Sequence, residues 1–126
     1  MALALDAITF DCADPVKVAA FWAAAMGFEV VAPDPEGTIV RDPSGATKGF
    51  FFQPVPEAKI AKNRVHLDVR PTGSMAAEVE RLKGLGATVR GFIEEGGIFW
   101  TQMRDPEGNE LCVLRGPQDG WSPDEL

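Results

Sequence analysis

The feature that most constrains the fold of this chain is an internal repeat. The segment Arg-Asp-Pro-Ser-Gly at residues 41–45 returns as Arg-Asp-Pro-Glu-Gly at residues 104–108. Upstream of each copy lies a helix-like stretch that ends at a glycine, Gly27 in the first copy and Gly86 in the second. The same signals in the same order indicate a duplicated supersecondary unit. We therefore expect two copies of one structural module.

Each copy has the same predicted order of elements. Alternating apolar and polar residues predict a first strand around 8–12 and its counterpart around 65–69, because a half-buried strand has a period of two. Apolar residues at helical spacing predict a helix after each strand, capped by Asp14 in the first copy and by Ser74 or Thr72 in the second. Three further strands are predicted around residues 28–31, 37–41 and 49–54, and around 87–92, 98–103 and 111–114. The predicted fold class is α+β, with two tandem βαβββ modules at 3–57 and 62–115.

Composition excludes several classes of function. The 126 residues carry 12 Lys+Arg against 19 Asp+Glu, a net charge of −7, which disfavours binding to nucleic acid or to anionic membrane surfaces. No apolar run approaches the length of a membrane span, and the N-terminus lacks the basic start of an export signal. The two cysteines, Cys12 and Cys112, lie in separate apolar runs and are expected to be buried thiols. A cytoplasmic location is predicted.

Several motifs support a family resemblance. They are Phe21-Trp22, Met26-Gly27-Phe28, Lys-Asn-Arg-Val-His-Leu-Asp at 62–68 and Asp-Pro-Glu-Gly-Asn-Glu-Leu-Cys at 105–112. With the repeated βαβββ order, they make the chain resemble the vicinal oxygen chelate superfamily of glyoxalases, extradiol dioxygenases and bleomycin resistance proteins, and in particular its glyoxalase-like domain group. The resemblance implies curved mixed sheets around a ligand cleft, a domain over 1–116 followed by a tail at 117–126, and a homodimer.

The resemblance also implies where metal ligands would lie. In metal-dependent members, two ligands come from the first strands of the two copies and two from the last strands. These positions fall on His66 and Ala7 and on Cys112 and either Gln53 or Phe51. Alanine cannot ligate a metal, and hard ions require oxygen ligands. We therefore predict no complete metal site, with His66, Gln53 and Cys112 as the candidates if a divalent metal binds.

His66 has two interpretations. It is either a hydrogen-bonded core or cleft residue, or a general acid or base beside Asp68, because imidazole titrates near neutral pH. Asp68 and Arg70 either form an ion pair along the strand or line the ligand site. Cys112 is either an inert buried thiol, or a soft metal ligand or reactive thiol. The Lys62-Asn63-Arg64 cluster is either a solvated linker or a contact for a ligand carboxylate.

The late strands carry aromatic residues that suggest a stacking wall. In Phe50-Phe51-Phe52 and in Phe99-Trp100, alternate side chains are expected in the core and in a ligand pocket. Trp22 on the first helix is predicted to be core. No dinucleotide fingerprint is present around Gly84 to Gly86. The candidate ligand-binding residues are Thr9, Asp11, Phe52, His66, Asp68, Arg70, Trp100 and Gln102.

These observations predict a glyoxalase/bleomycin-resistance-like protein of unassigned reaction that binds a small organic molecule in its cleft. The alternative is a metal-dependent lyase, isomerase or dioxygenase of the same superfamily. The missing ligands at Ala7 and Cys112 favour binding, and His66 is the candidate catalytic residue. The tail at 117–126 is rich in Pro, Gly and acidic residues and is predicted to lack regular structure. Trp121 is expected to dock on its own domain or on a partner subunit.

Overall fold

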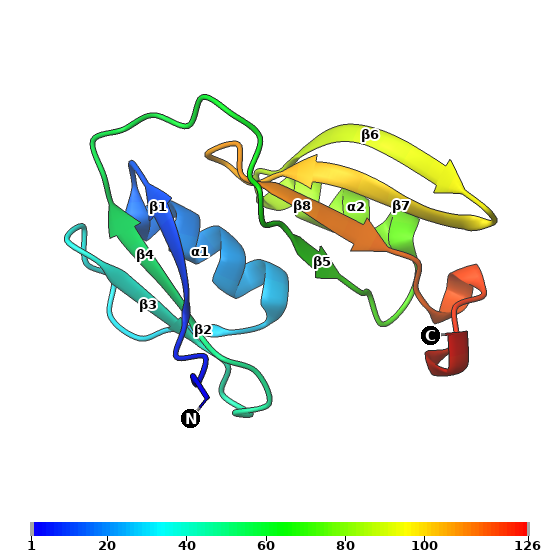
Figure 1. The fold of residues 1–126 in the computed structure, drawn as a ribbon, viewed down its shortest axis with the longest axis horizontal. Helices are drawn as coiled ribbons and strands as arrows, with labels where there is room; N and C mark the ends of the chain where they lie inside the picture. Colours follow the sequence, from blue (N-terminus) through cyan, green and yellow to red (C-terminus); the bar gives the residue numbers. More distant parts are fainter. Residues whose placement is uncertain (1, 126) are drawn as a thin grey trace. The chain divides into compact units, whose positions relative to one another are not determined.

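The structure is a computed structural model that describes residues 2–125 (Figure 1). The chain divides into two compact units, with the boundary between Ile60 and Ala61. Each unit contains an α-helix and a four-stranded mixed sheet. The predicted α+β class with two βαβββ modules is therefore confirmed. Within residues 2–125, no helix is both long and apolar enough to cross a membrane.

The first unit contains β1 (Ile8–Cys12), α1 (Pro15–Met26), β2 (Glu29–Val30), β3 (Thr38–Arg41) and β4 (Phe50–Pro54). Its strands are ordered β1-β4-β3-β2, with β1 parallel to β4 and the other pairs antiparallel. The predicted cap of α1 is confirmed, because the Asp14 carboxylate accepts a hydrogen bond from the Lys17 N–H at 3.1 Å. The helix ends at Gly27, whose φ of 70° is the left-handed conformation that glycine adopts without strain.

Aromatic side chains fill the core between α1 and the first sheet. Trp22 is almost completely buried and its ring centroid lies 5.1 Å from that of Phe10, which confirms the prediction that Trp22 is core. Phe52 is fully buried and stacks on Phe10 at 5.0 Å. Phe50 is also buried and meets the edge of the Trp22 indole. In the Phe50–Phe52 run, the first and last rings thus face α1.

The second unit contains β5 (Leu67–Val69), α2 (Met75–Leu85), β6 (Thr88–Glu95), β7 (Ile98–Arg104) and β8 (Glu110–Leu114). Its strand order is β5-β8-β7-β6, which matches that of the first unit. The first strand is shorter than predicted, because Val65 is exposed and lies outside the ladder. Just upstream, the Asn63 N–H donates to the Glu110 side chain rather than to a strand backbone.

The second helix has the predicted cap and stop. The Ser74 hydroxyl accepts a hydrogen bond from the Ala77 N–H at 3.2 Å, so Ser74 and not Thr72 is the cap. A second acceptor comes from the tail, where Asp119 Oδ2 lies 2.7 Å from the Met75 nitrogen. The helix ends at Gly86, whose N–H donates to the carbonyls of Leu82 and Lys83.

The repeated Arg-Asp-Pro-x-Gly segment is a turn organised by its aspartate. In the β3–β4 connection, hydrogen bonds from the side chain and backbone of Ser44, and from Thr47, lower the pKa of Asp42 to about 2. In the β7–β8 connection, Asp105 is buried and accepts hydrogen bonds from the backbones of Glu107 and Asn109 and from the Asn109 amide. The repeat that reveals the duplication therefore has a structural role in both copies.

The tail is more ordered than predicted. Short 3₁₀ helices form at Pro117–Asp119 and at Pro123–Glu125, so the prediction that the tail lacks regular structure is wrong. The physical reason is that Asp119 Oδ2 accepts hydrogen bonds from both Gly116 and Met75 and holds the first turn against α2. Trp121 lies with its ring 4.0 Å from the Arg70 guanidinium carbon. Of the two alternatives expected for Trp121, the contact with Arg70 places it on its own domain.

Candidate functional site

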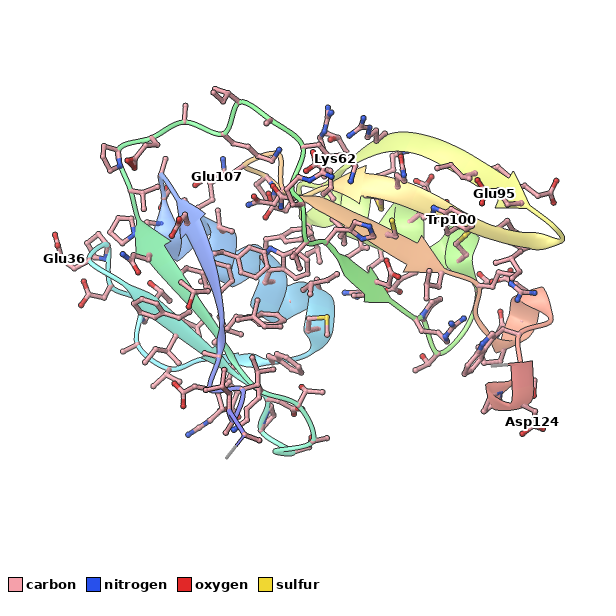
Figure 2. All side chains as sticks on the ribbon, viewed as in Figure 1. Glu36, Lys62, Glu95, Trp100, Glu107 and Asp124 are labelled. Carbon is pink, nitrogen blue, oxygen red and sulfur yellow. The ribbon has the colours of Figure 1, made fainter. Side chains whose placement is uncertain are left out.

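The sheet of the second unit has one face covered by α2 and one face opposite it. The Thr101 hydroxyl lies 3.5 Å from the Met75 sulfur of α2, and Met103 is fully buried, so Thr101 and Met103 face the helix. Successive side chains of a strand point to opposite faces. Trp100, which is labelled in Figure 2, and Gln102 therefore lie on the face opposite α2, and both residues are partly exposed.

Strand pairing places further candidate residues beside these two. Cys112 on β8 is paired with Asp68 on β5 and with Gln102 on β7, so the three residues form one row across the face opposite α2. Trp100 pairs with Leu114 on one side and with Ile93 on the other, which forms the adjacent row. The fold thus brings two rows together. We call the row of Ile93, Trp100 and Leu114 the aromatic row, and the row of Asp68, Cys112 and Gln102 the polar row.

His66 precedes β5 and lies next to the polar row. Its Nδ1 is 3.2 Å from Asp68 Oδ1, and its side chain is 36% exposed. It is therefore not a core residue but sits beside Asp68, as the acid or base interpretation requires. An imidazole held by a carboxylate has a fixed ring orientation, which a proton-transfer group needs.

The Cys112 thiol is poorly suited to nucleophilic chemistry. Burial raises the pKa of Cys112, and the Asp68 carboxylate raises it further, while the Lys62 charge acts in the opposite direction. The reactive form of cysteine is the thiolate. The raised pKa therefore favours the inert-thiol interpretation over a catalytic one.

The donor set of His66, Asp68 and Cys112 can be tested against a metal ion. One ligand atom from each residue lies within 4.8 Å of the other two. Imidazole, carboxylate and thiolate suit a borderline-soft ion such as Zn²⁺, and they do not suit Mg²⁺ or Mn²⁺, which prefer oxygen ligands. A Zn²⁺ ion held there would supply Lewis acidity, but it would first have to displace the thiol proton.

The first unit does not reproduce this donor set. Thr9 is as far from Gly27 as Asp68 is from Gly86, and Thr9 pairs with Phe51 just as Asp68 pairs with Cys112. The register therefore identifies Phe51, not Gln53, as the counterpart of Cys112. Gln53 pairs instead with Asp11. Ala7 and Phe51 offer no ligand atoms, and Gln53 lies one pleat further along the strand.

Two predicted ligand-binding residues lie elsewhere. Phe52 is fully buried in the core between the first sheet and α1, and we remove it from the candidate site. Arg70 NH1 donates to the Arg115 carbonyl at 2.7 Å, and its guanidinium covers Trp121. Arg70 therefore holds the tail. In the first unit, Thr9 and Asp11 are exposed on the first strand.

Sequence reasoning missed an ionic cluster on the face opposite α2. The Glu110 side chain is only 6% exposed, and its Oε2 lies 3.7 Å from Arg90 NH1 and 3.6 Å from Arg104 Nε. Its Oε1 accepts a hydrogen bond from the Asn63 N–H at 2.8 Å. Arg104 could have been found by stepping two residues from Gln102, but Arg90 could not, because a β-bulge between Val89 and Gly91 breaks the alternation.

Comparison with known structures shows the same fold in proteins of low sequence identity. FosX, a fosfomycin resistance protein from Listeria monocytogenes solved with Mn(II) and 1S,2S-dihydroxypropylphosphonic acid, is 16% identical, with a TM-score of 0.72 over 94% of this chain and 96% of that one. A glyoxalase/bleomycin resistance protein/dioxygenase family enzyme from Burkholderia phytofirmans PsJN is 17% identical, with a TM-score of 0.67 over 86% of this chain and 97% of that one.

A third structure has no stated activity. It is protein ATC0852 from Agrobacterium tumefaciens, which is 16% identical, with a TM-score of 0.72 over 91% of this chain and 98% of that one. A comparison with curated proteins finds no significant match. A family profile described as a glyoxalase-like domain matches residues 7–114, which is most of the chain. The chain therefore belongs to the glyoxalase-like domain family.

Proposed function

We propose that this protein binds a small organic molecule on the face of its second sheet opposite α2. The observation that carries the proposal is the pair of adjacent rows on this face, with Trp100 in the aromatic row and Asp68 and Gln102 in the polar row. Ligand sites commonly combine an apolar wall with a few convergent polar groups. The indole would stack on a planar ring, and the Gln102 amide would donate or accept a hydrogen bond.

The His66–Asp68 pair gives this face a capacity for proton transfer without a metal. The carboxylate orients the imidazole through the 3.2 Å contact at Nδ1. Imidazole is the side chain most often used as a general acid or base in proteins. Within this proposal, His66 is the candidate acid or base.

The solved relatives support this type of function without naming the ligand. FosX was solved with a small phosphonic acid, which shows that this fold accommodates small organic molecules in that protein. A homodimer and a cytoplasmic location complete the proposal. The exposed Phe92 and Ile98 on the edge hairpin β6–β7 offer apolar surface that a second copy would cover.

Replacing Trp100 with alanine tests the proposed binding face. Titration of benzyl alcohol and phenylphosphonate into the ¹⁵N-labelled protein should shift the amide resonances of Gln102, Cys112 and Leu114. We expect Trp100→Ala to weaken binding of both compounds about tenfold, because the stacking partner is lost. The matched control is Phe92→Ala, which removes an exposed ring on the same sheet whose strand partner, Thr101, faces α2. Equal losses in the two variants, or shifts confined to other residues, would contradict the proposal.

Metal content separates this proposal from the metal-dependent alternative, in which His66, Asp68 and Cys112 would be ligands. We expect protein purified without chelators or a histidine tag to contain no stoichiometric divalent metal by mass spectrometry, because Ala7 and Phe51 supply no ligands and the raised pKa of Cys112 makes loss of its thiol proton more costly. Added Co²⁺ should likewise give no thiolate charge-transfer band. One equivalent of metal that disappears in both His66→Ala and Cys112→Ser, but not in Cys12→Ser, would instead establish the metal-dependent alternative.

A further inference from the structure

The proposed function gives no role to the ionic cluster of Glu110, Arg90 and Arg104. This cluster lies at the end of the second sheet where β7 ends and β8 begins, and Arg104 is directly paired with Glu110 across these strands. Arg90 reaches the same carboxylate from the bulge in β6. A β-bulge often redirects a side chain near a functional site. The cluster shares its face with Gln102, two residues from Arg104 on β7.

The two guanidiniums are positioned by Glu110 but not saturated by it. Both approach the same oxygen, Oε2, at 3.6 and 3.7 Å, whereas charge-assisted hydrogen bonds between guanidinium and carboxylate are about 2.7–2.9 Å long. The Arg90 and Arg104 side chains are 36% and 46% exposed, while that of Glu110 is 6% exposed. A buried carboxylate thus attracts two cations at distances longer than a charge-assisted hydrogen bond, and within residues 2–125 both guanidiniums stay exposed enough to meet a second anion.

Lys62 adds a third positive charge to this end of the sheet. Its ammonium contacts the Asn63 carbonyl at 3.5 Å, and the N–H of Asn63 donates to Glu110. Two arginines therefore lie near one buried carboxylate, and Lys62 is next in sequence to the residue whose N–H donates to it, in a chain whose net charge is −7. Such a local excess of positive charge attracts anions to this place on an otherwise acidic protein.

We propose that Lys62, Arg90 and Arg104 form a binding site for the anionic group, a carboxylate or a phosphonate, of the molecule that binds to the face opposite α2. This inference rests on the proposed function and specifies its ligand class as an anionic organic compound with a planar ring. The anion would lie at the cluster, and the rest of the ligand would extend past Gln102 toward Trp100, which lies four residues from Arg104 along β7. Guanidinium groups present paired N–H donors that match the oxygens of either anion.

The test compares three probes that share one ring. Benzoate, phenylphosphonate and benzyl alcohol are titrated into the full-length ¹⁵N-labelled protein at low salt, with the arginine Nε–H resonances observed. We expect both anions to shift the Arg90 and Arg104 resonances and to bind about tenfold more tightly than benzyl alcohol. Added salt should narrow this difference, because exposed charges are screened. Tighter binding of only one anion would support the site and identify which anion it selects.

Charge variants separate the cluster from a merely structural role. Arg104→Gln and Arg90→Gln should each weaken binding of the two anions and leave binding of benzyl alcohol unchanged. The control is Arg41→Gln, at an exposed ion pair with Glu29 in the first unit, which should not change the affinity for any probe. Glu110→Gln keeps the acceptor for the Asn63 N–H but removes the negative charge, so it should tighten anion binding. If the two arginines had a purely structural role, Glu110→Gln would not increase the affinity for the anions. Circular dichroism of each variant verifies that the fold is intact.

The outcomes distinguish failure of this inference from failure of the proposed function. If no probe binds to the face opposite α2, the proposed function is wrong and the inference falls with it. If benzyl alcohol binds there and the anions have no advantage, only the inference is wrong. It is also overturned if the anion preference survives both arginine variants, or if Glu110→Gln weakens the anions.

Discussion

Replacing Phe52 with alanine should lower the free energy of unfolding by about 3–5 kcal/mol, as is typical when a buried phenylalanine is truncated. Phe52 is fully buried and stacks on Phe10, and Phe10 in turn contacts Trp22 of α1. The cavity would therefore open inside the aromatic core of the first unit. Urea denaturation followed by circular dichroism measures the loss, with constant slope showing that the two-state reference is unchanged.

The neighbouring residue provides the control for this prediction. Phe51 points to the opposite face of the same strand and is only partly buried, so Phe51→Ala should cost clearly less. Phe52→Ala should leave probe binding on the second sheet unchanged, because its role is in the core. A small loss of stability for Phe52→Ala together with weaker probe binding would show that Phe52 belongs to the ligand site and not to the core.

The Phe50–Phe52 run shows why sequence alone placed one aromatic residue wrongly. Alternation identifies the buried face of a strand only when polar residues mark the other face. Three consecutive phenylalanines carry no such mark, so the face of each ring is undetermined until the strand is paired. The structure resolves the ambiguity through the contacts of Phe50 and Phe52 with Phe10. In β7, by contrast, the polar residues Thr101 and Gln102 follow Trp100, and the sequence predicts that the Trp100 ring lies in the ligand pocket.

The fold was predictable because its signals are local. Asp14, Ser74, Gly27 and Gly86 each act within one turn of their own helix, and the structure confirms all four. Arg70 shows the limit of such reasoning. Its spacing from Asp68 suggested a shared role in the ligand site, but contacts with Arg115 and Trp121, distant in sequence, direct it to the tail.

The ionic cluster was missed for a related reason. Glu110 follows the conspicuous Asp105–Asn109 turn and appeared to be only part of a family motif. Its place in the cluster depends on Arg104, which is its partner across the strand pair, and on Arg90. Arg90 lies at a β-bulge that no local sequence pattern predicts. Cross-strand charge pairs of this kind require the register, and the register of β6 and β7 is set by their pairing rather than by either segment alone.

Replacing Asp105 with alanine should lower the free energy of unfolding by about 2–4 kcal/mol, because buried donors would lose their acceptor. Asp105 accepts hydrogen bonds from the Glu107 N–H, the Asn109 N–H and the Asn109 side-chain amide at 2.9–3.0 Å. Asn109 Oδ1 in turn accepts a hydrogen bond from the side-chain amide of Asn63. The same substitution should therefore shift the backbone amide resonances of Asn63, whose N–H donates to Glu110.

The first copy of the repeat supplies the matched control. Asp42 occupies the equivalent turn position, but its partners Ser44 and Thr47 are exposed, so water can replace the lost carboxylate. Asp42→Ala should therefore cost less than Asp105→Ala and should leave Asn63 unperturbed. Equal losses in the two copies would mean that the turn motif, and not burial of its donors, determines stability. The expected asymmetry would show that one duplicated motif closes an exposed turn in the first unit and anchors the Glu110 cluster in the second.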